Sequence, residues 1–391
     1  MPDGVHNAAT VEFDHVTKHY GAADAKKGAL GAVNDLSLVV PAGKICVLVG
    51  PSGCGKTTSL KMVNRLIEPT SGRILLDGVD ASTRDLIELR RNIGYVIQQV
   101  GLFPHQTIEE NVATVPRLLG WSEERRLARA GELLHLMGLE PGRYARRYPT
   151  QLSGGERQRV GVARALAADP PIMLMDEPFG AVDPIVRERL QNEFLRLQED
   201  LAKTILFVTH DIDEAIKMGD VVAVLQVGGD LAQFGTPADI LANPASEFVA
   251  QFVGADRGLK RLSLYRIADV PLETIPTGKV GEPSAPARAR LLAHPFEYLL
   301  VLDAADRPLG WASLSSVSTA DQVTAEMAHA SSPYFDRLTT LKDALSMLLD
   351  ATVQVGVVVD PHGAYLGILT VDGIANWIRE QSAAEPAQGI G

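Results

Sequence analysis

The 391-residue sequence contains only two cysteines, Cys46 and Cys54. Two cysteines cannot build a disulfide framework or a zinc site of the usual kind. No apolar run approaches the ~20 residues that span a bilayer. The first fifteen residues lack a basic segment followed by an apolar one, so we expect no secretory signal. These absences predict a soluble, cytosolic protein. If it works at a membrane, a partner must supply the membrane span.

Basic residues are fewer than acidic ones, with Lys+Arg 37 against Asp+Glu 48 and a net charge of −11. An acidic chain is a poor general binder of nucleic acid, because phosphate contacts need a basic surface. A local basic patch is still possible. The 46% hydrophobic and 22% charged residues are a globular balance that excludes a disordered or fibrous protein. The length predicts two or three domains.

Residues 1–254 are predicted to form one α/β domain. Short β-rich runs recur at residues 45–49, 172–175 and 205–208, separated by helical patterns. After Asp183, apolar residues have the spacing of a buried helical stripe. They are Val186, Leu190, Phe194, Leu197 and Leu201. Such alternation predicts a mostly parallel sheet. Residues 100–150 lack strand patterns, and their helical stripe (Leu127, Ala130, Leu134, Met137) predicts an inserted helical subdomain.

Residues 255–391 are predicted to form a second, smaller α+β domain. The prolines between Asp269 and Arg290 indicate a loop or linker. Two later segments, EYLLVLDAADRPLGWASL and VQVGVVVDPHGAYLGILT, share their Asp-to-Leu-Gly spacing and lie 57 residues apart. Each indicates strand, turn and strand, so we expect two copies of one small unit. The tail from Gln381 is predicted to be disordered.

The segment GPSGCGKT fits the phosphate-binding pattern GxxxxGK[ST] between a strand and a helix. It comprises Gly50, Pro51, Ser52, Gly53, Cys54, Gly55, Lys56 and Thr57, and Thr58 follows in the helix. Glycines let the backbone N–H groups surround a phosphate chain. We expect Lys56 to reach the β- and γ-phosphates and Thr57 to bind Mg²⁺. The alternative is an ordinary glycine-rich turn. Cys54 is interpreted as a packing residue.

Two further strands end in candidate catalytic residues. The strand IMLM is followed by Asp176 and Glu177. Asp176 suits a Mg²⁺ ligand, and Glu177 suits the group that orients or deprotonates the attacking water. Without the phosphate loop, two solvated acids would be the simpler interpretation. The strand TILFVT ends at His210, which is either structural or a contact to the γ-phosphate.

The segment LSGGERQ contains Ser153, Gly154, Gly155 and Glu156. By itself it could be a helix cap with Ser153 as the capping residue, or a second anion site. Together with the phosphate loop, it makes the chain resemble the nucleotide-binding subunit of an ABC transporter, a family whose signature motif LSGGERQ matches. The resemblance covers nearly all of residues 1–254. It implies a P-loop NTPase fold with a helical insert, binding ATP and Mg²⁺.

The resemblance also assigns roles to individual residues. Tyr20 matches the aromatic residue that stacks on adenine, with a plain strand-end tyrosine as the alternative. Gln98 matches the glutamine that touches Mg²⁺ and signals to the membrane subunit, with Gln99 as the alternative register. Asp183 matches the aspartate that acts across the dimer. Val182 replaces the usual leucine, a small departure.

The resemblance implies a homodimer that encloses ATP between Lys56 of one subunit and Ser153 of the other. Residues 101–105, GLFPH, suit a docking surface for a membrane permease, and local core is the alternative. The ATPase would be a peripheral protein at the cytoplasmic face of the membrane.

The C-terminal repeat resembles a pair of CBS domains. ABC subunits with this tail resemble the ATPases of osmoprotectant importers, which move glycine betaine, carnitine, choline or proline. Such systems include a permease and an extracytoplasmic substrate-binding protein. CBS pairs often bind adenine nucleotides through a Gly-x-x-Thr/Ser-x-x-Asp pattern, from which both copies depart. Asp372 falls one residue early after Gly367 and Thr370, and Ser316 replaces Asp after Gly310 and Ser313. A structural or dimerising role is the alternative.

Two other functions compete with osmoprotectant import. The first is an ABC importer ATPase for another small solute, such as an amino acid or polyamine, which the CBS-like tail disfavours. The second is a soluble ABC ATPase acting on DNA. The latter proteins interrupt the ATPase with coiled coils or zinc modules, which this acidic sequence lacks. We therefore expect no nucleic-acid partner.

Overall fold

The computed structural model describes residues 8–20, 32–97, 101–180, 182–329, 332–351 and 354–384. Gln98 and Gln99 lie outside these ranges. The chain divides into two units, Met1–Ala255 and Asp256–Gly391.

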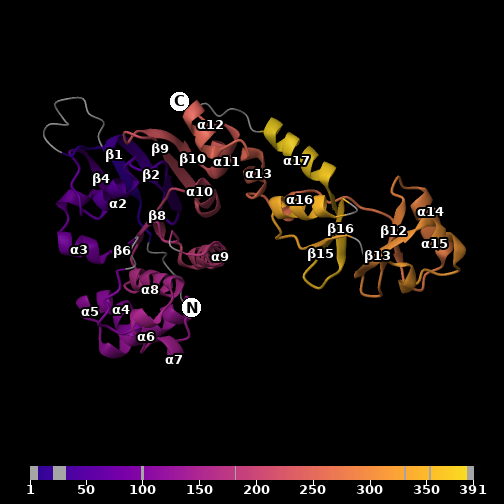
Figure 1. Ribbon diagram of the computed structural model, residues 1–391, viewed down its shortest axis with the longest axis horizontal. Coiled ribbons are helices and arrows are strands. Elements are labelled where there is room, and N and C mark those ends of the chain that lie inside the picture. The colour runs from indigo at the N-terminus through magenta and orange to yellow at the C-terminus, as the bar shows by residue number, and fades with distance from the viewer. Residues whose placement is uncertain are drawn as a thin grey trace. The chain divides into compact units, whose positions relative to one another are not determined.

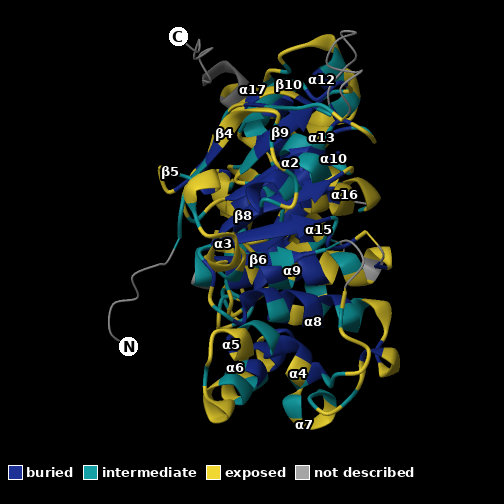
Figure 2. Cartoon of the chain, turned by 90° about the vertical axis from the view of Figure 1, so that its left-hand side faces the viewer, coloured by how far each residue is buried: buried dark blue, intermediate teal, exposed yellow. Residues whose placement is uncertain are grey.

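The first unit is built on a six-stranded sheet with the order β10-β9-β3-β8-β7-β6. These strands are β3 (Ile45–Val49), β6 (Ile93–Val96), β7 (Ile172–Asp176), β8 (Thr204–Thr209), β9 (Val221–Leu225) and β10 (Leu231–Gly235). All neighbours are parallel except β9 and β10, which confirms the mostly parallel sheet. Every residue of β3, β7 and β8 is buried, and β8 is dark blue in Figure 2. Burial on both faces explains their continuous apolar sequences.

Helices follow these strands along the chain. They are α2 (Lys56–Val63), α8 (Gly154–Leu166), α9 (Pro184–Leu201), α10 (Ile212–Met218), α11 (Pro237–Ala242) and α12 (Glu247–Val253). On α9, Leu190, Phe194 and Leu197 are buried as the stripe predicts, but Val186 is 38% exposed. Val186 lies on the first turn of α9 and is therefore not part of the buried stripe.

A second, antiparallel sheet was not predicted from the sequence. Its order is β2-β1-β4-β5. The strands are β1 (Val11–Lys18), β2 (Val33–Val40), β4 (Ser71–Leu76) and β5 (Val79–Asp80); η1 (Ala81–Thr83) and α3 (Leu86–Arg91) follow. Phe13 and Leu36 are buried in the same core as Leu48 of the central sheet. The two sheets therefore share one hydrophobic core.

Between β6 and β7, the described residues from Gly101 onward contain helices and no strand. The helices are α4 (Ile108–Val112), α5 (Thr114–Leu118), α6 (Glu123–Leu136), α7 (Pro141–Tyr144) and η2 (Pro149–Gln151). Ala130 and Leu134 of the α6 stripe are fully buried. Figures 1 and 2 show α4–α8 gathered at one end of this unit. Among the described residues of the whole chain, none of the helices is long and apolar enough to cross a bilayer.

The second unit contains two three-stranded sheets with the same topology, β11-β12-β13 and β14-β15-β16. The first repeat has β11 (Thr277–Lys279), α14 (Ser284–Leu292), β12 (Tyr298–Leu302), β13 (Pro308–Ser313) and α15 (Leu314–Thr319). The second has β14 (Tyr334–Phe335), α16 (Leu341–Asp350), β15 (Val355–Val359), β16 (Tyr365–Thr370) and α17 (Val371–Ala384). Val301 pairs with Gly310 and Val358 with Gly367, at matching positions of the repeats. The expected strand–turn–strand repeat is therefore present.

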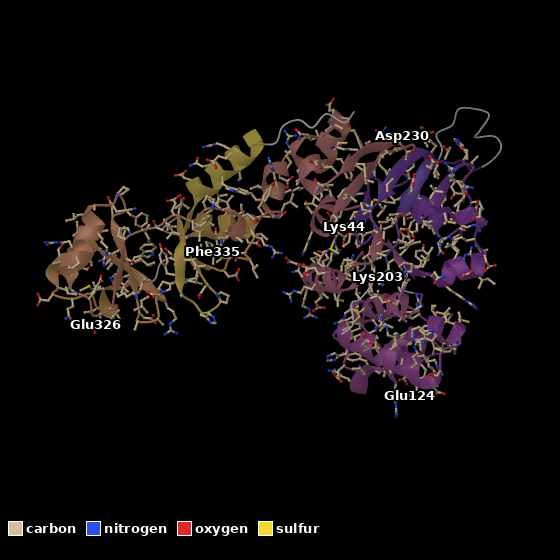
Figure 3. The ribbon with its side chains drawn as sticks, turned by 180° about the vertical axis from the view of Figure 1, so that it is seen from behind. Lys44, Glu124, Lys203, Asp230, Glu326 and Phe335 are labelled. Carbon is tan, nitrogen blue, oxygen red and sulfur yellow. The ribbon has the colours of Figure 1, made fainter. Side chains whose placement is uncertain are left out.

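Each repeat has its own apolar core, and a third cluster joins the two sheets. Phe335, labelled in Figure 3, belongs to the core of the second repeat. A side chain at Gly356 would place its Cβ 2.1 Å from the Phe335 ring, so the ring packs directly over this glycine. Short helices α13 (Arg257–Leu262), η3 (Ile267–Asp269) and η4 (Ala325–Met327) complete the unit.

Two predictions for the second unit were wrong. The expected linker, Asp269–Arg290, contains β11 and most of α14. Pro283 is the N-cap of α14 and Pro286 lies in its first turn, where the missing N–H has no intrahelical partner to lose. The second wrong prediction is the start of the disordered tail at Gln381, because α17 extends to Ala384.

Candidate nucleotide-binding site

The phosphate-binding loop joins the central strand β3 to the first turn of α2. Its glycines adopt positive φ angles, 82° at Gly53 and 92° at Gly55. A Cβ at Gly55 would lie 2.0 Å from the Ala32 carbonyl oxygen. Around Gly53 the corresponding position is open, with nothing within 4 Å. The loop is therefore tightly packed at its base and open at its turn, as a phosphate-binding backbone requires.

Lys56 lies across this loop. Its Nζ donates to the carbonyl oxygens of Gly50 at 2.6 Å and Pro51 at 2.9 Å, and it lies 3.6 Å from the Cys54 Sγ. The Lys56 side chain is 7% exposed, and Cys54 is fully buried. The ammonium group is thus held within the loop, where a bound phosphate chain would meet it. The burial of Cys54 agrees with its interpretation as a packing residue.

Thr57 and Asp176 form the oxygen-rich part of the site. The Thr57 Oγ1 donates to the Asp176 Oδ1 at 2.9 Å. Burial raises the pKa of Asp176, and the neighbouring Glu177 charge adds to this effect, while the Thr57 hydrogen bond and Lys61 oppose it. No cluster of three His, Cys, Asp or Glu ligands occurs among the described residues. One hydroxyl and one carboxylate fit Mg²⁺, which takes its other ligands from phosphates and water.

Glu177 and His210 end neighbouring strands and meet in space. The His210 Nδ1 lies 3.1 Å from the Glu177 Oε1. Glu177 has a left-handed backbone, with φ 47°, and its N–H donates to the Val208 carbonyl at 3.0 Å. A non-glycine residue in this region is strained. In this backbone conformation the Glu177 carboxylate meets the His210 imidazole at the carboxyl edge of the sheet.

The LSGGE segment begins α8. Ser153 is the N-cap, and its Oγ accepts the Glu156 N–H at 3.3 Å while the Ser153 N–H donates to the Glu156 Oε2 at 2.7 Å. The Ser153 backbone hydrogen bond lowers the pKa of Glu156, and the Tyr144 hydroxyl also contributes by donating to Oε1 at 2.8 Å. Ser153 and Gly154 are exposed. The first turn of α8 is therefore capped by its own side chains, and Ser153 and Gly154 are accessible at the surface.

Three other predicted site residues are Tyr20, Asp183 and Gln98. Tyr20 follows β1 and is 52% exposed, with the Lys18 Nζ 5.4 Å from its ring centre. Asp183 precedes α9, and its carbonyl accepts the Arg187 N–H at 2.7 Å. Gln98, the expected Mg²⁺ contact, lies outside the described residues.

The segment after Gln98 is exposed at Phe103, which is 40% accessible, so the local-core alternative is wrong. Asn111, which sequence reasoning did not single out, fixes this segment. It is fully buried, accepts the Phe103 N–H at 2.7 Å and donates to the carbonyls of Phe103, Gln106 and Thr107. A polar residue in a short helical run gives no signal of burial, so only the fold identifies it.

Comparisons with known proteins agree with this geometry. Residues 33–180 match the family model described as "ABC transporter". The osmoprotectant import ATP-binding protein OsmV of Salmonella typhimurium is 45% identical, over 94% of this chain and 96% of that protein. The chain belongs to the family of ABC transporter ATP-binding proteins. Its ABC ATPase fold therefore confirms the predicted fold class.

Other relatives of this ABC ATPase have related names. The glycine betaine/carnitine/choline transport ATP-binding protein OpuCA of Bacillus subtilis is 44% identical, over 92% of this chain and 94% of that protein. ProV of Escherichia coli, a glycine betaine/proline betaine transport ATP-binding protein, is 40% identical over 88% and 87%.

Among solved structures, the dimeric ABC transporter cassette MJ0796 is 36% identical with a TM-score of 0.52, covering 58% of this chain and 98% of that one. A second structure of MJ0796, with the same scores, is a post-hydrolysis state with ADP and Pi. Both likenesses are confined to part of the chain.

Proposed function

We infer that this ABC ATPase hydrolyses ATP to power the uptake of quaternary-amine osmoprotectants. The observation that carries the chemistry is the convergence of Lys56, the Thr57–Asp176 pair and the Glu177–His210 pair at the carboxyl edge of one sheet. The substrate class rests on the full-length relatives, which are named for osmoprotectant, glycine betaine, carnitine or choline transport.

Each residue has a defined task in this proposal. Lys56 neutralises the β- and γ-phosphates, and Thr57 and Asp176 hold Mg²⁺, which when bound offsets phosphate charge. Glu177 orients the attacking water and accepts its proton, while His210 holds the Glu177 carboxylate in position and lies beside the γ-phosphate. Tyr20 supplies a stacking face for adenine.

We propose that each ATP site is completed by a second subunit. The signature helix α8 packs on α4, α6 and β6, whereas α2 of the phosphate loop packs on β7 and β8. Both the Ser153 turn and the loop at Gly53 are exposed in the single chain. A two-fold pair would place Ser153 and Asp183 of one subunit against the ATP held by Lys56 of the other. The dimeric MJ0796 structure supports this arrangement.

Mixing two inactive variants tests the shared site. Lys56→Ala and Ser153→Arg chains are each expected to lack ATPase activity. In a mixed dimer, one site carries both substitutions and the other carries neither. We expect the mixture to recover about a quarter of wild-type activity, assuming random pairing and independent sites. Purified heterodimers without activity would contradict the shared site. This conclusion requires that dimers with one intact site hydrolyse ATP in another pairing.

The proposed partners are an integral membrane permease and an extracytoplasmic substrate-binding protein. The ATPase would lie peripherally at the cytoplasmic face of the membrane. The exposed segment from Gly101 to His105, held by Asn111, is the proposed permease contact, since it presents Phe103 on a rigid turn.

The solute class can be tested in the assembled complex. We expect the ATPase to copurify with a multi-span permease, and glycine betaine with its binding protein to stimulate ATP hydrolysis. Stimulation by an amino acid or polyamine and not by quaternary amines would favour the second importer hypothesis.

We propose that the C-terminal unit is a tandem CBS-like regulatory module that takes an adenine nucleotide at its first repeat. That repeat has a cleft of about 440 Å³, whose lining includes Phe296, Tyr298 and Ser313. In the second repeat the Thr370 hydroxyl is already bonded to the Glu273 carboxylate at 3.2 Å and accepts the Gly373 N–H at 2.9 Å. An internal carboxylate at this position disfavours an anionic ligand there.

Truncation separates catalysis from regulation. A chain ending at Gly254 is expected to bind and hydrolyse ATP, because the predicted ATP-site residues all precede the second unit. The response of the reconstituted complex to salt and to added adenine dinucleotides should change, since surface charge contacts are screened over ~8–10 Å. Identical salt and nucleotide curves with and without the tail would leave dimerisation as its role.

A further inference from the structure

A buried carboxylate outside the ATP contacts links two helices of the catalytic unit. Glu214 on α10 is 9% exposed, and Gln191 on α9 is 5% exposed. The Gln191 Nε2 donates to the Glu214 Oε1 at 2.9 Å. Charged side chains are seldom buried unless they are paired or hydrogen-bonded. Glu214 is therefore a buried acid whose ionised form depends on the groups around it.

On one side, Glu214 is connected to the loop that carries His210. The Glu214 N–H donates to the Asp211 Oδ1 at 3.4 Å, and Thr209 lies close enough for its hydroxyl to lower the pKa of the Glu214 carboxyl. The same Thr209 oxygen accepts the Asp211 N–H at 3.1 Å. An ionised carboxylate can only accept, so the Thr209 hydroxyl donates its single proton to Glu214 while its lone pair accepts from Asp211. The residues on both sides of His210 are thus fixed by a relay that ends at the Glu214 carboxylate.

On the other side, Glu214 is connected to the loop that carries Asp183. Arg187, on the first turn of α9, lies close enough for its charge to stabilise the Glu214 carboxylate. The Arg187 Nη2 donates to the Val182 carbonyl at 3.2 Å, and its N–H donates to the Asp183 carbonyl at 2.7 Å. Gln191 lies one turn further along the same helix face. Glu214 therefore lies between Arg187 and Thr209.

We propose that Glu214 is a positioning residue that holds the His210 loop and the Asp183 loop in one arrangement. His210 belongs to the site of one bound ATP, and Asp183 is proposed to act at the dimer interface. The ionised Glu214 carboxylate couples these loops because it accepts from Gln191 and is stabilised by Thr209 and by the charge of Arg187. The inference rests on the proposed roles of His210 and Asp183.

The charges around Glu214 make its interaction with Gln191 depend on pH. Burial raises the pKa of Glu214, and the Asp211 charge raises it further, while hydrogen bonds from Thr209 and Gln191 and the Arg187 charge lower it. Lys217 of α10 and Glu188 of α9 face each other 3.9 Å apart at the exposed edge of the same helix pair. Since the net direction is upward, Glu214 gains its proton at a higher pH than an exposed glutamate. The positioning is lost as the pH falls through that value.

Exchanging the two side chains tests the coupling. In the full-length chain, Glu214→Gln is expected to lower kcat about 10- to 100-fold, as misplacement of catalytic groups does, with KM for ATP nearly unchanged. The double variant Glu214→Gln/Gln191→Glu keeps one amide and one carboxylate and places the acid one turn from Arg187. It should recover most of the lost kcat. Thr209→Val should reproduce the loss, and Thr209→Ser should not.

Gln198, on the same helix α9 as Gln191, provides a matched control. The Gln198 side chain is buried but bonds the backbone of Gly43 and Lys203, at the sheet edge opposite His210. Gln198→Met should lower the melting temperature and leave kcat per folded molecule within about twofold. In a pH series, the acidic decline of wild-type kcat should begin at a higher pH than that of Glu214→Gln, whose remaining decline reports the general base Glu177.

The inference fails if Glu214→Gln keeps wild-type kcat, or if the folded double variant recovers nothing. His210→Ala, measured in parallel, separates this failure from failure of the site assignment. An active His210→Ala protein would overturn the assigned role of His210 itself. An inactive His210→Ala beside a fully active Glu214→Gln would overturn only the role of Glu214.

Discussion

Glu177→Gln is expected to lower kcat for ATP hydrolysis by about 10²- to 10⁴-fold, the contribution of a positioned general base. The amide keeps the size of the side chain and its reach to His210, whose Nδ1 lies 3.1 Å from Oε1, but cannot accept a proton from water. ATP binding should persist, so the variant should accumulate as an ATP-bound closed dimer. Steady-state ATPase assays and size-exclusion chromatography with ATP would measure both effects.

The control for this substitution is Glu188→Gln. The Glu188 side chain is 74% exposed and pairs with Lys217 at 3.9 Å, so this change should leave kcat within about twofold. A Glu177→Gln protein that hydrolyses ATP at the wild-type rate would show that Glu177 is not the base.

Lys56→Ala should remove ATP binding, with an affinity loss of at least about 100-fold. Charge-assisted hydrogen bonds contribute about 1.5–3 kcal/mol each, and the phosphates lose more than one of them. The substitution also removes the bonds from Nζ to the Gly50 and Pro51 carbonyls, so the loop loses its internal brace. Titration with a fluorescent ATP analogue measures the loss directly.

Lys44→Ala is the matched control. Lys44, labelled in Figure 3, is half-exposed and its Nζ pairs with the Asp220 Oδ1 at 3.1 Å, away from the phosphate loop. Its removal should leave the ATP affinity unchanged. Undiminished binding by a folded Lys56→Ala protein would mean that the loop does not hold the phosphates.

Much of the catalytic unit could be predicted because its signals are local. The strands at residues 45–49 and 172–175 lie almost where continuous apolar runs placed them. Glycine spacing located the phosphate loop, since positive φ at Gly53 and Gly55 is a local requirement. The repeat was recognisable because both copies keep the same turn spacing.

Other features depend on contacts between distant residues. Nothing in the sequence around Gln191 distinguishes it from a solvent-facing amide, and its partner Glu214 is 23 residues away. Asn111 and Tyr144 are likewise polar residues on helices whose burial or bonding is decided by tertiary packing. The antiparallel sheet was missed because β1 pairs with β4 across 50 or more residues. The prediction of a linker over Asp269–Arg290 was wrong because prolines also occur at helix starts.

ATP-driven uptake in proteoliposomes is the most direct test of the proposed function. The full complex, with the permease and binding protein, would be loaded with ATP at the side of the ATPase and given labelled glycine betaine. We predict accumulation that requires ATP and is abolished by Glu177→Gln. Betaine accumulation that is equal without ATP or with the Glu177→Gln subunit would contradict the proposed function.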